Sequence, residues 1–152
     1  VAIIPNFFLN AVVAIGIDIV GGEKQWIGTG FIVGRKENDN RELSTYYIIT
    51  NKHVIVSQKC VYVRFNSLVG QLVKDYRVDL YDKDGLPLFS AHPNKMTDIV
   101  ALQILPGTLI NDQSIWGAFD LEDHALVLEQ MRATGVEEGS FVYALGFPYE
   151  FG

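Results

Sequence analysis

The chain of 152 residues contains a single cysteine, Cys60, so it cannot form a disulfide within itself. Its stability therefore does not depend on an oxidising compartment. A chain of this length buries about two-thirds of the surface that it exposes when unfolded, which is enough for an ordinary hydrophobic core. With 49% hydrophobic and 20% charged residues, the composition is that of a globular domain.

Positive charge is scarce: 12 Lys and Arg residues against 18 Asp and Glu residues give a net charge of −6. A surface with this balance repels phosphate backbones and anionic lipids, so we expect neither nucleic acid nor membrane partners. Residues 1–17 are apolar, but they lack a basic segment, and Pro5, Asn6 and Asn10 interrupt them. They fit neither a signal peptide nor a membrane-spanning helix. The compartment stays open between bacterial cytoplasm and periplasm.

Sustained helical periodicity is nearly absent. Residues 51–56 fit one helical turn, and residues 126–133 have helix-compatible spacing that ends before Gly135. Short runs of β-branched and aromatic residues dominate instead, separated by Gly, Asn and Asp. These runs predict seven strands, at residues 11–19, 26–33, 45–50, 61–65, 76–82, 99–105 and 141–145.

Turn signals separate these strands. Gly21-Gly22 lies between the first two strands, the polar residues 35–42 predict an exposed loop, and Asp84-Gly85 is typical of a tight turn. Residues 76–82 alternate between polar and apolar, which predicts a strand with one wet face. Residues 99–102 are apolar throughout, which predicts a strand buried on both faces.

The predicted fold class is all-β. Six strands over residues 1–105 describe an antiparallel six-stranded barrel. Residues 106–140 would form a connector, and residues 141–152, with the seventh strand, would begin a second unit. No internal repeat or low-complexity tract is present.

Two residues in this pattern are candidates for catalysis. His53 follows an apolar strand where the chain turns, so a rigid wall can hold its ring toward a cleft, as a general base requires. Asp98 comes just before another apolar strand, where its carboxylate can accept hydrogen bonds and orient an imidazole. Gly28 and Gly30 lie in one predicted strand and indicate close packing beneath the His53 loop. Taken singly, each residue is more often an ordinary loop, turn or bulge residue.

The order of the surrounding segments makes the pattern specific. The chain carries Gly-Thr-Gly-Phe-Ile-Val, Ile-Ile-Thr-Asn-Lys-His-Val, Thr-Asp-Ile-Val-Ala-Leu and Tyr-Ala-Leu-Gly-Phe-Pro in this order. Over residues 11–148 it resembles bacterial trypsin-like (chymotrypsin-fold) serine peptidases. The resemblance implies that His53 is the general base and Asp98 its orienting partner. It also implies that residues 1–105 are the first of two barrels and that residues 143–148 form the first strand of the second, closed by Pro148.

The family's nucleophile lies in a Gly-x-Ser-Gly type of segment, and none of the six serines here has that context. Gly139-Ser140-Phe141 is excluded because a predicted strand follows at once. The oxyanion hole and the specificity pocket would also come from outside these residues. We therefore expect the protein to be a serine endopeptidase acting on polypeptide substrates, and the 152 residues alone to be inactive.

Two other functions stay open. The chain could be a catalytically silent trypsin-like module that binds or scaffolds proteins, or an unrelated small β-barrel binding domain. As half of a two-barrel fold, the fragment would expose apolar surface that the second barrel normally covers, which predicts association with itself or with a partner.

The remaining reactive side chains give no further site. His92 precedes Pro93 in a polar loop, where it borders the cleft or is an ordinary loop residue, and His124 lies in the connector without a partner that the sequence can name. Cys60 reads as a small core residue on the strand after His53. The three histidines are not at ligand spacing, so neither a metal site nor a cofactor is predicted.

Overall fold

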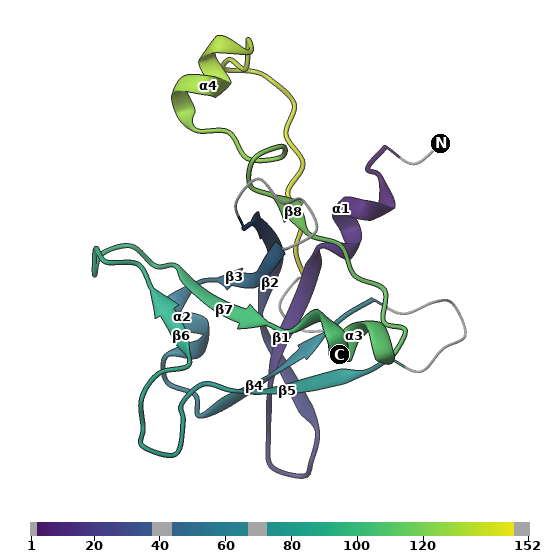
Figure 1. The fold of residues 1–152 in the computed structure, drawn as a ribbon, viewed down its shortest axis with the longest axis vertical. Coiled ribbons are helices and arrows are strands. Elements are labelled where there is room, and N and C mark those ends of the chain that lie inside the picture. The colour runs from purple at the N-terminus through teal and green to yellow at the C-terminus, as the bar shows by residue number, and fades with distance from the viewer. Residues whose placement is uncertain (1–2, 38–43, 67–72, 148–152) are drawn as a thin grey trace.

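The chain folds around an antiparallel sheet of seven strands that curls into a half-barrel (Figure 1). The computed structural model describes residues 3–37, 44–66 and 73–147. The strands lie in the order β5-β4-β1-β2-β3-β7-β6. Their bounds are β1 Val12–Asp18, β2 Lys24–Lys36, β3 Ser44–Thr50, β4 Cys60–Arg64, β5 Asp75–Asp79, β6 Phe89–Ala91 and β7 Val100–Ile104. The all-β prediction holds in its coarser form, because the fold is mostly β and its helices are short. In place of the predicted six-stranded barrel, the structure has a seven-stranded half-barrel.

The described residues also form four short helices: α1 Asn6–Asn10, α2 Lys52–Ile55, α3 Pro106–Asn111 and α4 Leu128–Ala133. A two-residue strand, β8 Phe119–Asp120, pairs parallel with β2. Figure 1 shows α4 at the end of an excursion that projects away from the sheet. In the described part of the chain, no helix combines the length and apolar character needed to cross a membrane.

The predicted turns are present and depend on glycine. Gly21 and Gly22 have φ angles of 101° and 82° and close the hairpin between β1 and β2. Gly85 has a φ of 79° in the predicted Asp-Gly turn. The Asp82 carboxylate stabilises that turn, because its Oδ1 accepts from the amides of Asp84 at 2.9 Å and Leu86 at 2.8 Å. Left-handed φ values of this kind favour glycine, which explains why turn composition predicted them well.

One predicted strand is wrong. Residues 141–145 are not in a strand, and the side chains of Phe141 and Val142 are 100% and 84% exposed. A strand needs a neighbour to accept its backbone hydrogen bonds, and no described segment pairs with these residues. Pro148, which was expected to close this strand, lies outside the described residues.

Part of the predicted loop at 35–42 is also wrong. Arg35 and Lys36 belong to β2, where they pair with Thr45 and Ser44 of β3. Polar side chains are compatible with a strand when they face solvent along an extended hairpin. Residues 38–43 lie outside the described part of the chain.

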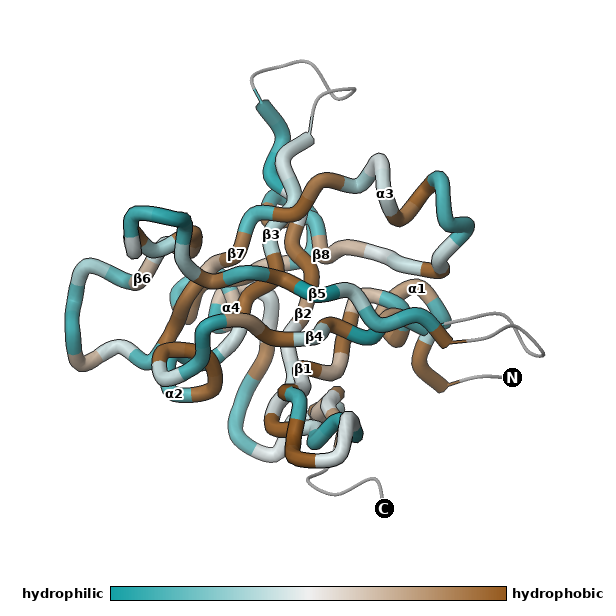
Figure 2. The backbone as a smooth tube through the Cα atoms, turned by 90° about the horizontal axis from the view of Figure 1, so that it is seen from below, coloured by the Kyte–Doolittle hydropathy of each residue, from teal (hydrophilic) through white to brown (hydrophobic). Residues whose placement is uncertain are grey.

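The core lies on the concave side of the curled sheet. Its largest fully buried side chains are Val13, Ile15, Ile32, Ile48, Ile55, Val61, Val63, Leu80, Val100 and Leu102. The predicted alternation in β5 is confirmed, because Arg77 and Asp79 are exposed while Val78 is half-buried. Figure 2 shows both hydrophobic and hydrophilic residues along the backbone of the sheet.

The strand β7 differs from its prediction. Val100 and Leu102 are buried, but Ala101 is half-buried and Ile99, just before the strand, is 45% exposed. Only one face of β7 therefore packs into the core, because the half-barrel has a single concave side.

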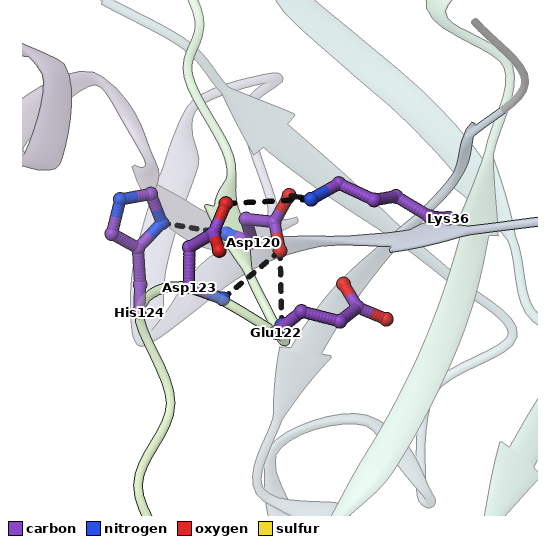
Figure 3. Close-up of polar contacts among 5 residues, drawn as sticks. All are labelled: Lys36, Asp120, Glu122, Asp123 and His124. Atoms are coloured by element: carbon purple, nitrogen blue, oxygen red, sulfur yellow. Dashed lines mark hydrogen bonds and ion pairs between the residues drawn. The ribbon is translucent and has the colours of Figure 1, made fainter. Parts of the chain in front are cut away.

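Residues 106–140, the predicted connector, contain α3, β8 and α4. A polar network fixes part of this stretch to the end of β2 (Figure 3). The Lys36 ammonium lies 3.0 Å from the Asp120 carboxylate and 3.3 Å from that of Asp123. The first of these interactions is the main reason why the pKa of Asp120 falls to about 2. The predicted helix at 126–133 is confirmed as α4, with Gly135 at a φ of 79° beyond its end.

Candidate active site

Strand pairing brings His53 and Asp98 together. His53 lies in α2, which begins two residues after the end of β3, and Asp98 lies two residues before the start of β7. β3 and β7 are antiparallel neighbours, and Thr50 at the end of one pairs with Val100 at the start of the other. The chain leaving β3 and the chain entering β7 therefore meet at one edge of the sheet.

The two side chains are joined by two hydrogen bonds. The backbone amide of His53 donates to Asp98 Oδ1 at 2.9 Å, and the ring Nδ1 of His53 is bonded to Asp98 Oδ2. These bonds lower the pKa of Asp98 below its ordinary value, with the backbone amide of His53 as the largest cause and its side chain as the second. The carboxylate is therefore held in its charged form, which is the form that can orient and stabilise a protonated imidazole.

The outer edge of the His53 ring is open. The His53 side chain is 67% exposed and that of Asp98 is 44% exposed. Among the residues that the structure describes, none is hydrogen-bonded to His53 Nε2. An imidazole held by its Nδ1 and open at its Nε2 can accept a proton from a group that approaches from solvent.

The Gly-Thr-Gly segment packs directly beneath the His53 loop, as predicted. A Cβ atom added to Gly28 would lie 2.8 Å from Val54 Cγ1, so only glycine leaves room for α2 at this distance. The hydroxyl of Thr50 donates to the backbone oxygen of Thr29 at 2.9 Å. Packing and hydrogen bonding thus attach the beginning of the His53 loop to β2.

The segment ending at Phe147 approaches the same part of β2 from the connector. The amide of Phe147 donates to Thr29 Oγ1 at 2.8 Å, although 118 residues separate the two. A Cβ added to Gly146 would lie 3.4 Å from the same hydroxyl oxygen. Residues from all four segments that carried the family resemblance therefore lie around Thr29 and the His53 loop.

The other two histidines lie outside this pair. His92 Nδ1 accepts from the amide of Asn94 at 3.1 Å within its own loop. His124 Nδ1 accepts from the amide of Asp120 at 2.9 Å, so the connector histidine does have a partner (Figure 3). Neither side chain is hydrogen-bonded to His53 or Asp98.

The structure also adjusts two smaller predictions. Cys60 is half-buried rather than in the core, because it begins β4 on the face opposite to Val61 and Val63. The reason given for excluding Ser140 as the nucleophile, a strand directly after it, is wrong, because residues 141–145 are not in a strand. Ser140 lies in a turn, where its hydroxyl accepts from the amide of Glu137 at 3.1 Å. Within residues 3–37, 44–66 and 73–147, no cluster of His, Cys, Asp and Glu is suited to a metal ion.

A cleft of about 600 Å³ lies away from the His53–Asp98 pair, between the N-terminal segment, β2 and the connector. Its lining is mostly apolar and includes Val12, Phe31, Val33, Phe119 and Leu145. Neither His53 nor Asp98 borders it. The cleft therefore adds apolar surface to the molecule but no group to the candidate site.

Two features of the structure had no local signal in the sequence. Asn51 donates from its side chain to the backbone oxygen of Asp98 at 3.0 Å. Lys36 pairs with Asp120 and Asp123 far along the chain. Both contacts join segments that only the folded sheet brings together.

Comparisons with family models, with curated proteins and with solved structures found no match to this chain, so its function must be inferred from the geometry around His53.

Proposed function

We propose that this chain supplies the general base and the orienting carboxylate of a serine endopeptidase with a trypsin-like fold. The observation that carries the proposal is the pairing of His53 Nδ1 with the Asp98 carboxylate on a side chain that is 67% exposed and has no described hydrogen bond at Nε2. The two residues are 45 positions apart, and their approach depends on the pairing of β3 with β7. A base that is oriented on one side and open on the other is the arrangement that acyl transfer needs.

In the proposed reaction, a serine hydroxyl attacks the carbonyl carbon of a peptide bond and gives its proton to His53 Nε2. Asp98 stabilises the imidazolium that forms. When the C–N bond breaks, Nε2 returns that proton to the leaving amine nitrogen. Water then repeats the sequence on the acyl-enzyme, which releases the second product and restores the serine.

The same proposal assigns the half-barrel to the first barrel of a trypsin-like double barrel. The strands β5 and β6 lie at the two edges of the sheet and follow each other in the chain. The residues between them form a hairpin-like turn, in which the amide of Leu88 donates to the backbone oxygen of Leu80 at 2.9 Å. The contact of Phe147 with Thr29 supports a second unit that begins beside the His53 loop. The nucleophile and the groups that bind the oxyanion would belong to that second unit.

Labelling with a fluorophosphonate probe tests the proposal, because an activated serine displaces fluoride from the probe and becomes covalently modified. We expect labelling of the protein expressed from its complete gene and no labelling of the 152-residue chain. His53→Ala should abolish the labelling, and His92→Ala, which removes a histidine held within its own loop, should leave it intact.

Labelling that survives His53→Ala would remove His53 from the reaction. The absence of labelling in a correctly folded complete protein would favour the silent binding module instead.

A further inference from the structure

Asn51 stands immediately before α2, at a position where its side chain would normally cap the helix. An asparagine there usually accepts a hydrogen bond from one of the first free amides of the helix. The Asn51 side chain makes no such bond. Its Nδ2 instead donates to the backbone oxygen of Asp98, at 3.0 Å.

The carboxylate of Asp98 takes over the capping role. Its Oδ1 accepts from the amide of His53, the second residue of α2, at 2.9 Å. The amide of Lys52 also lowers the pKa of Asp98, although it is the weakest of the contributing causes. The cap of α2 is therefore supplied by the Asp98 carboxylate and not by Asn51. The Asn51 side chain instead binds the backbone oxygen of Asp98.

These two hydrogen bonds fix the orientation of the Asp98 carboxylate. The backbone oxygen of Asp98 is bonded to Asn51, and Oδ1 is bonded to the amide of His53. Oδ2 is then directed at the Nδ1 of the His53 ring. We infer that Asn51 is a positioning residue, which acts through Asp98 to set the orientation of the His53 imidazole. The inference deepens the proposed function and rests on it for its catalytic meaning.

The contact is unsuited to a mainly stabilising role. Asn51 is exposed, and a hydrogen bond that competes with water contributes little to the free energy of unfolding. The same bond can still decide geometry, because the distance between base and carboxylate changes when either backbone segment shifts. The position before α2 therefore matters more for orientation than for stability.

The 152-residue chain is suited to a direct test, because its mass of 17.0 kDa permits NMR spectroscopy. Two readouts report the pair: the downfield proton signal of His53 Nδ1–H, and the carboxyl carbon of Asp98 followed against pH. In Asn51→Ala we expect loss of the proton signal and an upward shift in the pKa of Asp98. Asn51→Gln, which keeps the amide donor, should restore part of both.

Asn66→Ala is the matched control, because Asn66 also donates from Nδ2 to a backbone oxygen, that of Leu9, at 3.2 Å. It should leave both readouts unchanged. If Asn51→Ala does not fold, Asn51→Asp has the same shape and suits the residue before a helix, but it cannot donate. Loss of the proton signal in Asn51→Asp would support the inference, and its retention would overturn it.

Unchanged signals in a folded Asn51→Ala would equally overturn the inference. Neither readout needs a substrate or a serine. A failed labelling experiment with shifted signals would therefore reject the peptidase and keep the positioning role of Asn51. Successful labelling with unchanged NMR signals would support the peptidase and reject the positioning role of Asn51.

Discussion

Gly28 lies directly beneath Val54, so close that a Cβ at Gly28 would stand 2.8 Å from Val54 Cγ1. Val54 is buried and β-branched, and it cannot turn away without disturbing α2. We expect Gly28→Ala to lower the free energy of unfolding by about 1–3 kcal/mol, as overpacking does in other cores. Urea unfolding measures the change.

Gly107→Ala is the control for this prediction, because a Cβ at Gly107 meets no neighbour within 4 Å. That variant should be neutral or raise stability by up to about 1 kcal/mol. In the Gly28→Ala/Val54→Ala double variant, relief of the clash should give a coupling energy of about 1 kcal/mol. Strictly additive effects would show that the two side chains do not compete for this space.

The ion pair between Lys36 and Asp120 predicts a pH-dependent contribution to stability. The pKa of Asp120 is about 2 in the folded protein, below its ordinary value of 3.8. A carboxyl group with a lowered pKa stabilises the fold above its ordinary pKa and loses that effect as pH falls through its folded pKa. We expect Lys36→Met to lower the melting temperature by about 1–3 °C at pH 7, and the difference to shrink as pH falls from about 4 to about 2.

Lys74→Met is the comparison variant, because the Lys74–Asp112 pair is more exposed and longer, at 3.5 Å. Its effect at pH 7 should be smaller. A difference between Lys36→Met and the unmodified chain that persists unchanged at pH 2 would contradict the assignment to Asp120. Calorimetric scans at several pH values provide the measurement.

Two leucines near the end of β7 should differ sharply in their contribution to stability. Leu102 is 1% exposed within the core, whereas Leu105 is 76% exposed just beyond the strand. Leu102→Ala should cost about 2–5 kcal/mol of unfolding free energy, because it leaves a cavity among packed side chains. Leu105→Ala should change stability by no more than about 0.5 kcal/mol. Equal effects in urea unfolding would contradict the placement of the core.

The apolar cleft beside β2 predicts association of the isolated chain. Phe31 is 41% exposed and Tyr143 is 65% exposed, and both line the cleft. Because uncovered apolar surface favours association, sedimentation should depend on concentration. Phe31→Ser with Tyr143→Ser should weaken the association at least about tenfold. Val20→Ser, at a fully exposed hairpin position, should not, and a monomer at high concentration would count against the prediction.

The local sequence pattern predicted those strands whose composition agrees with their position in the folded sheet. β1 to β3 were predicted because their β-branched runs are bounded by glycine or polar turns. β6 and β8 were not, because strands of three and two residues depend on the neighbour against which they lie. Residues 141–145 have the composition of a strand but lack a described partner, so composition alone misled the prediction.

The candidate site divides in the same way. His53 and Asp98 were predicted from the order in which four sequence segments follow one another along the chain. The structure shows that the two residues meet because β3 pairs with β7. Asn51 was part of a recognised segment, yet its interaction with Asp98 has no local signature and emerges only from tertiary geometry. The contact between Lys36 and Asp120 is equally invisible along the chain.

The ladder between β3 and β7 has a consequence for how such a protein could change over time. Because β3 and β7 are hydrogen-bonded neighbours, the distance between His53 and Asp98 does not depend on the path that the chain takes between the two strands. Insertions or deletions at the surface turn around Gly85 would lengthen or shorten that path without moving either group. The loops of this domain can therefore diversify around an unchanged pair.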